Sequence, residues 1–308
     1  MKFNTYLKNC REHNALTQEE LVHSLYSYNI DMFEGLDTST LSKWERGITQ
    51  PKASKQVSMI KYFQKESGVV LPCWNTYSIQ EAEEHICQAG VKNLLGKNKQ
   101  LVLNFPSDMM QLDDLKVYPV RHSDRMDTLL DINIDLHKNA NHPFSQISLE
   151  QFKTWALHPS NLFLACEYKN GFSGLFFSLR LKPEVFQKII NFEMKKSELD
   201  IEDFASFDEV GSNYMLSFYA LNDKVATMLF IRYYAHLIAN QTKIKEIGVI
   251  TALDDVKKVV NNMNLEETKS MITDDKVELK SYTQSLSNVL VSENVVKMLF
   301  SKLDCPEA

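Results

Sequence analysis

The sequence predicts an α + α/β protein, in which an all-α domain precedes a mixed β-sheet domain flanked by helices. Residues 3–66 contain only helical signals, namely capping residues followed by apolar residues at helical spacing. Residues 115–290 instead alternate apolar strands with amphipathic helices and include a hairpin signal at Asn170-Gly171. With 308 residues, the chain is long enough for each domain to bury its own core.

Changes in this pattern divide the chain into four segments. Between the two domains lies a helical joining region, whose helix begins at Ser78 with Glu81 as its capping-box partner. The chain ends in a helix that carries one apolar stripe, formed by Val295, Val296, Leu299, Phe300 and Leu303. The predicted domains are therefore 1–66 (all-α), 67–114 (joining region), 115–290 (mixed sheet) and 291–308 (final helix and tail).

Two helix starts follow one another closely between residues 16 and 51. Thr17 is a good N-cap with Glu20 as its capping-box partner. Asp37 or Thr38 can cap a second, shorter helix, and polar residues lead that helix. Two short helices joined by a turn in this way describe a helix-turn-helix.

The motifs LTQEEL and TLSKWERG, with a proline four residues later, resemble the XRE family, the Cro/phage-repressor class of DNA-binding domains. The resemblance covers about residues 3–66. It implies that Gln18 holds a DNA phosphate at a helix N-terminus and that Arg11 and Glu45 form an internal ion pair. It also places six further residues on DNA: Thr38, Ser39 and Thr40 at base edges in the major groove, with Ser42, Lys43 and Arg46 nearer the backbone.

The resemblance implies a double-stranded DNA operator as partner, bound by a homodimer, because one short recognition helix reads too few bases. The candidate dimer contacts are the final helix and the joining helix at residues 78–95. A final helix packed on its own domain is the alternative. One departure from the family is the nine-residue insertion Tyr26–Glu34, which lengthens the first helix or forms a bulged turn, and which can offset the recognition helix.

Charge is distributed unevenly along the chain. The net charge is −6, yet residues 1–66 hold nine Lys or Arg against eight Asp or Glu. From Thr38 to Lys65, six basic residues stand against Glu45 alone. This local excess lies beside the expected recognition helix and suits a nucleic-acid backbone, although a solvated basic face is the plainer interpretation.

The cysteines and histidines give no metal or disulfide pattern. The five cysteines are scattered and lack CxxC spacing, so we expect neither a disulfide framework nor a zinc site, and the spacing of the histidines predicts no metal. The amino terminus lacks the apolar core of a signal peptide, and no run reaches about 18 apolar residues. We therefore expect a cytoplasmic protein.

Residues 115–290 read as strand, two helices, hairpin, strand, long helix, strand, helix and strand. This order, with KVYPVRHSD at its start, resembles the GNAT acyltransferase fold. The resemblance implies acetyl-CoA or another acyl ligand, held where the central strand meets the long helix. The candidate ligand cleft there comprises Phe218, Tyr219, Ala220, Asn222 and Lys224.

Two departures from the GNAT pattern affect chemistry. The stretch Ala220–Thr227 contains no glycine for close approach to phosphates, and Val260 stands where family members carry a tyrosine as general acid. We therefore predict a DNA-binding transcription regulator with no catalytic residues, whose GNAT-like domain is a ligand sensor or dimerisation scaffold. The alternative is an active acyl-CoA-dependent N-acyltransferase that carries a DNA-binding domain. A third interpretation is an antitoxin-like partner protein.

Overall fold

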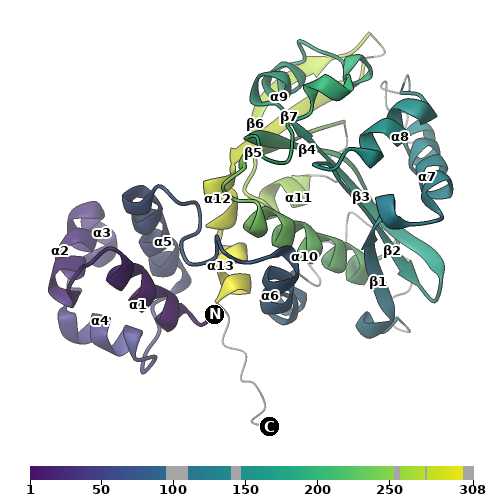
Figure 1. Ribbon diagram of the computed structural model, residues 1–308. Helices are drawn as coiled ribbons and strands as arrows, with labels where there is room; N and C mark the ends of the chain where they lie inside the picture. Colours follow the sequence, from purple (N-terminus) through teal and green to yellow (C-terminus); the bar gives the residue numbers. More distant parts are fainter. Residues whose placement is uncertain (95–109, 140–146, 253–256, 275, 301–308) are drawn as a thin grey trace. The chain divides into compact units, whose positions relative to one another are not determined.

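The computed structural model describes residues 1–94, 110–139, 147–252, 257–274 and 276–300, and it shows a mixed α/β protein (Figure 1). The stretch LVLNFP at residues 101–106, whose sequence predicts a short strand, lies outside these residues, as does Leu303. The chain forms two compact units. The first unit, which we call the helical unit, comprises residues 1–93, 234–242 and those from 287 on; the second, the sheet unit, comprises 94–233 and 243–286. The final helix is thus counted with the N-terminal helices and does not stand apart.

Polar side chains cap the N-terminal helices as their sequence predicts. The Thr17 hydroxyl accepts a hydrogen bond from the Glu20 amide at 3.2 Å, while the Glu20 carboxylate accepts one from the Thr17 amide at 2.7 Å. Asp37 caps the later helix by accepting from the Thr40 amide at 2.6 Å. The helices are α1 (Phe3–His13), α2 (Gln18–Tyr28), α3 (Ile30–Phe33), α4 (Thr38–Glu45) and α5 (Ala53–Ser67).

The insertion Tyr26–Glu34 both lengthens α2 and adds the single turn α3. Asn29 ends α2 and caps α3, because its side-chain oxygen accepts a hydrogen bond from the Met32 amide at 3.0 Å. Phe33 is fully buried, which anchors this turn in the helical unit. Gly35 then reverses the chain with a φ of +70°, a conformation that glycine adopts without steric cost.

The helical unit also includes α6 (Ile79–Leu94) and α13 (Glu293–Leu299), with α12 (Leu286–Leu290) leading into the latter. The described residues of the apolar stripe, Val295, Val296, Leu299 and Phe300, are buried. The Phe300 ring centroid lies 5.3 Å from that of Phe3 and 4.9 Å from that of Tyr6, both on α1. Of the two predicted uses of this stripe, packing on the chain's own helices is therefore the one observed.

The sheet unit contains one mixed sheet in the order β1-β2-β3-β4-β5-β7-β6. Neighbours are antiparallel except β4 and β5, whose parallel pairing requires the long crossover helix α10 (Asp223–Ala239). Residues on opposite faces of the sheet belong to separate apolar layers. The strands are β1 (Leu115–Pro119), β2 (Leu162–Tyr168), β3 (Gly171–Leu181), β4 (Gly211–Ala220), β5 (Ile244–Thr251), β6 (Glu266–Ile272) and β7 (Glu278–Ser285).

The hairpin turn between β2 and β3 lies one residue earlier than its sequence signal suggests. Tyr168 pairs with Gly171, so Lys169 and Asn170 form the two-residue loop. Both have positive φ, 49° and 64°, as a type I′ turn demands. Glycine at 171 therefore begins the strand, and asparagine tolerates the left-handed position.

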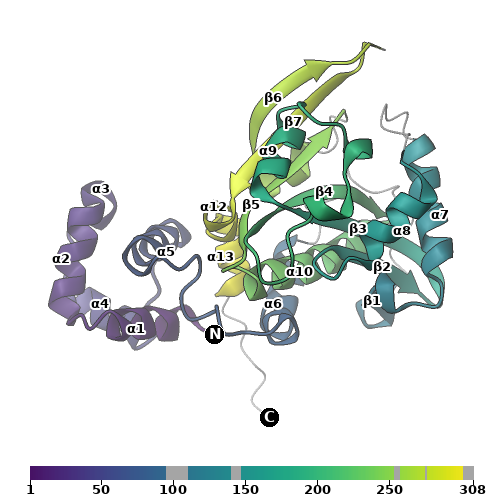
Figure 2. The same cartoon turned by 45° about the horizontal axis from the view of Figure 1, so that its top comes forward.

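Helices cover both faces of the sheet (Figure 2). One face packs on α7 (Met126–Asn139), α8 (Leu149–Leu157) and α9 (Pro183–Ile190), through a cluster that includes Trp155, Phe177 and Tyr214. The other face packs on α10, where Phe176 lies 4.4 Å from Tyr233 between ring centroids. The short helix α11 (Lys257–Asn262) follows β5. Within the described residues, no helix is both long and apolar enough to cross a bilayer.

Gly174 fixes how closely α10 approaches the sheet. A Cβ atom at this position on β3 would lie 2.7 Å from the Tyr219 carbonyl oxygen and 2.7 Å from the Val225 side chain. Real Cβ atoms do not approach other atoms so closely. The first turn of α10 therefore rests directly on β3 and β4, which sets the position of its N-terminus.

We expect Gly174→Ala to destabilise the protein by about 1–3 kcal/mol, because the extra methyl must displace strand backbone or the packed Val225. Urea unfolding followed by circular dichroism measures this change. Gly171→Ala is the matched control on the same strand, since its nearest contact would be at 3.3 Å. Equal losses in the two variants would show that close helix packing is not the cause.

Candidate functional site

Strands β4 and β5 are paired only at their beginnings. Their register runs through Gly211, Asn213 and Tyr214, and the last pair joins Tyr214 to Gly248. Beyond this pair, β4 continues to Ala220 and β5 to Thr251, so the two strands diverge; we call the segment pair Met215–Ala220 and Val249–Thr251 the fork. Where two parallel strands diverge in this way, their edges are exposed. These edges lie at the end of the sheet where the crossover helix begins.

A β-bulge lies at the start of the fork. Phe177 of β3 pairs with Ser217, whereas the next residue, Ser178, pairs with Met215, so Leu216 is the extra residue. A bulge bends its strand and re-aims the side chains that follow, and bulges are common next to active sites. The bend carries β4 away from β5 and explains why their pairing stops.

The bulge also decides which face each later side chain of β4 occupies. The Phe218 ring centroid lies 4.9 Å from that of Phe230 on α10, whereas Tyr219 stacks on Phe172 at 5.8 Å and borders the layer under α7–α9. The predicted cleft residues Phe218 and Tyr219 therefore point to opposite faces and do not line one cleft. Consecutive strand residues alternate in this way, which corrects the grouping made from sequence.

The remaining predicted cleft residues build the N-terminus of α10. Asn222 is 2% exposed; its side-chain oxygen accepts a hydrogen bond from the Val225 amide at 3.1 Å, and its amide nitrogen lies 3.0 Å from the Met110 sulfur. Lys224 donates to the Met110 carbonyl at 2.7 Å. Ala220 is buried beneath them. Asn222 thus acts as a helix cap, and Lys224 is held against the main chain.

The second departure from the GNAT pattern, Val260, lies on α11. Val260 is 2% exposed and carries no proton to donate. Asn264 has a φ of 57°, and asparagine adopts this left-handed conformation more readily than most residues. Position 260 therefore offers no proton donor to a reaction.

Tyr219 is the one titratable side chain on the β4 arm of the fork, residues 215–220. It is half-buried, and burial raises the pKa of its phenol above the ordinary value. The phenol is therefore protonated at neutral pH and can donate a proton. The sequence assigns Tyr219 to the candidate ligand cleft but does not indicate which face of the sheet it occupies, because the bulge that turns it away from α10 has no sequence signal.

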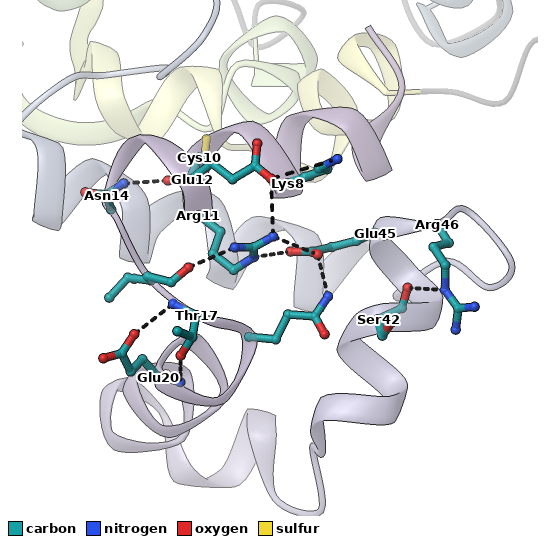
Figure 3. Close-up of polar contacts among 12 residues, drawn as sticks. Lys8, Cys10, Arg11, Glu12, Asn14, Thr17, Glu20, Ser42, Glu45 and Arg46 are labelled. Carbon is teal, nitrogen blue, oxygen red and sulfur yellow. Dashed lines mark hydrogen bonds and ion pairs between the residues drawn. The ribbon is translucent and has the colours of Figure 1, made fainter.

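The residues expected to contact DNA lie on α2, on α4 and, for Arg46, at the C-terminal cap of α4. Figure 3 shows Ser42 and Arg46 beside the contacts of Arg11 and Glu45. Arg11 and Glu45 form the expected ion pair, with Nε and Oε1 2.6 Å apart. Gln18, expected to hold a phosphate, donates instead to Glu45 at 2.7 Å. The Arg46 side chain donates to the Ser42 carbonyl at 3.2 Å. Thr38, Ser39, Lys43 and Arg46 are exposed and Thr40 and Ser42 half-buried, and their contact with DNA stays a prediction.

Glu45 holds α1, α2 and α4 together, since its carboxylate accepts hydrogen bonds from both Arg11 and Gln18. We expect Glu45→Ala to destabilise the helical unit by about 2–4 kcal/mol, because it leaves a guanidinium that is only 13% exposed without its partner. Thermal or urea unfolding measures the change. Glu12→Ala is the control: its carboxylate also faces Arg11 but is 52% exposed, so its loss should cost under about 1 kcal/mol. A Glu12 effect as large as that of Glu45 would contradict this account.

No family model and no curated protein sequence matches this chain. Among solved structures, it is similar to FeeM, an N-acyl amino acid synthase from uncultured soil microbes, with a TM-score of 0.39, 9% identity, and coverage of 57% of this chain and 91% of that one. It is also similar to an N-acetyltransferase from Staphylococcus aureus Mu50, with a TM-score of 0.37 and 11% identity; the match covers 56% of this chain and 98% of that one. A third similar structure is the acetyl transferase from Salmonella typhimurium that modifies the N-terminal serine of ribosomal protein L7/L12. Its TM-score is 0.36 and its identity 10%, and the match covers 58% of this chain and 97% of that one.

These matches correct the main functional prediction. All three proteins are acyltransferases, and the matched region is the C-terminal part of the chain, where the GNAT-like order of elements was expected. The prediction of a DNA-binding transcription regulator with a sensing or scaffolding GNAT-like domain is therefore wrong on this comparison. The alternative, an acyl-CoA-dependent N-acyltransferase, agrees with these matches better.

Proposed function

We propose that the sheet unit transfers an acyl group from an acyl-coenzyme A to an amine. The observation that carries this proposal is the fork: β4 leaves β5 after Tyr214, at a bulge, beside the N-terminus of α10. The pantetheine arm of an acyl-coenzyme A is extended and contains amide groups. It can therefore lie along such a strand edge and form hydrogen bonds with the strand backbone, as a peptide does when it adds a strand to a sheet. We assign the oxyanion site to main-chain N–H groups of β4 at its bulge, where the ladder with β3 is interrupted.

The pyrophosphate of coenzyme A is assigned to the N-terminus of α10. Helix N-termini favour anions, and the packing at Gly174 fixes this one beside the fork. Asn222 caps the first turn and keeps its amides oriented. Because residues 220–227 contain no glycine, the phosphates meet the end of the helix and not a deep loop, and Asp223 repels them. We therefore expect weaker coenzyme A binding than a glycine-rich loop would give.

The chemistry needs a nucleophile, an oxyanion site and a proton donor. The amine nitrogen attacks the thioester carbonyl, a C–N bond forms, and the carbonyl oxygen gains negative charge that main-chain N–H groups stabilise. Collapse of this intermediate breaks the C–S bond, and the thiolate takes a proton from the Tyr219 phenol. The phenolate then recovers a proton from the new ammonium, which leaves an amide and a thiol.

We expect Tyr219→Phe to lower kcat/KM by about 10²–10³-fold, since it removes the proton donor and little packing. The assay measures thiol release from acetyl-coenzyme A and longer acyl-coenzyme A with a panel of primary amines. Tyr26→Phe, a matched change on α2 of the helical unit, should leave turnover unchanged.

Because burial raises the Tyr219 pKa, activity should persist above about pH 10 before the phenol ionises. The proposed function would be refuted if the unaltered protein neither bound coenzyme A in calorimetry nor turned over any pair of acyl-coenzyme A and primary amine.

A further inference from the structure

Two cysteines of the helical unit meet although 62 residues separate them. The Sγ atoms of Cys10 on α1 and Cys73, in the turn after α5, lie 3.8 Å apart, and both are free thiols. Leu71 and Trp74, on either side of Cys73, are completely buried. These two anchors hold the turn against α1, and Cys73 itself has a φ of +64°, an uncommon conformation for a residue with a side chain.

The two thiols have unlike surroundings. Cys10 is 1% exposed, whereas Cys73 is partly exposed to solvent. The hydrogen bond from Cys10 lowers the pKa of the Cys73 thiol to about 7. The same bond, together with burial, raises the pKa of Cys10. Near neutral pH, Cys73 therefore supplies a reachable thiolate while Cys10 keeps its proton directly beneath it.

We propose that Cys10 and Cys73 form a reversible peroxide-reactive pair, in which the accessible Cys73 reacts first and the buried Cys10 resolves it. The Cys73 thiolate attacks a hydroperoxide, the O–O bond breaks, and the products are a Cys73 sulfenic acid and an alcohol or water. The Cys10 thiol then attacks the Cys73 sulfur, an S–S bond forms, and water leaves. The hydroperoxide is reduced by two electrons and the two thiols are oxidised by two; a dithiol reductant reverses the change.

Cys166 differs from this pair, because it is buried on β2, where burial raises its thiol pKa to about 12. Cys87 lies on α6 and is partly exposed. A disulfide would join α1 to the turn that carries Trp74, whose ring packs on Phe300 at 6.0 Å. Oxidation would thus tie together the core of the helical unit.

The test treats the full-length, reduced protein with stoichiometric hydrogen peroxide, alkylates remaining thiols and maps peptides by mass spectrometry. We expect a peptide pair linked through residues 10 and 73, lighter by two hydrogens, that dithiothreitol separates. Recovery of all five alkylated cysteines would overturn the proposal, as would a link from Cys73 to Cys87 or Cys305. This result does not depend on acyltransferase activity.

Three variants assign the two roles. In Cys10→Ser, a sulfenic-acid trap such as dimedone should label Cys73 after peroxide; in Cys73→Ser, residue 10 should remain an unmodified thiol. Cys87→Ser is the matched control and should keep the disulfide. Trapping at Cys10 in the Cys73→Ser protein would reverse the roles and contradict the proposal. If the Cys10→Ser or the Cys73→Ser variant fails to fold, the peptide map of the unaltered protein still decides.

Discussion

The parallel pairing of β4 with β5 is the constraint on which the rest of the sheet unit depends. Parallel neighbours cannot be joined by a tight turn, so the chain must cross the sheet through α10. That helix can lie on β3 and β4 only because Gly174 presents no side chain. The crossover therefore places a helix N-terminus at the end of the sheet where the paired strands separate, and these features occur together for one geometric reason.

The bulge at Leu216 connects this geometry with chemistry. Without the extra residue, alternation would continue unbroken from Tyr214, and residue 219 would face α10 while residue 218 would face the opposite layer. With it, Phe218 enters the core under α10 and the Tyr219 phenol reaches the other face, half-buried and protonated. A valine at 260 is compatible with acyl transfer only if a proton donor lies elsewhere, and the bulge puts a phenol on the fork.

The helical unit is held by contacts between residues far apart in sequence. The Glu45 carboxylate binds side chains from two other helices, and a charge so little exposed is stable because each of its oxygens accepts a hydrogen bond. Phe300, at the other end of the chain, packs on Phe3 and Tyr6. Gln18 is engaged within this network, so an anion that reached α2 would have to compete with Glu45 for it.

The sequence by itself determined the local elements and their order, because caps, turns and hydrophobic periodicity act over a few residues. Thr17, Asp37 and Ser78 begin helices where their side chains predict, and the order of helices and strands expected along the second domain is present. Tertiary structure alone decided the bulge at Leu216, the face of Tyr219, the burial of the final helix and the meeting of Cys10 with Cys73. Each of these depends on strand register or on packing between distant segments, which no local pattern specifies.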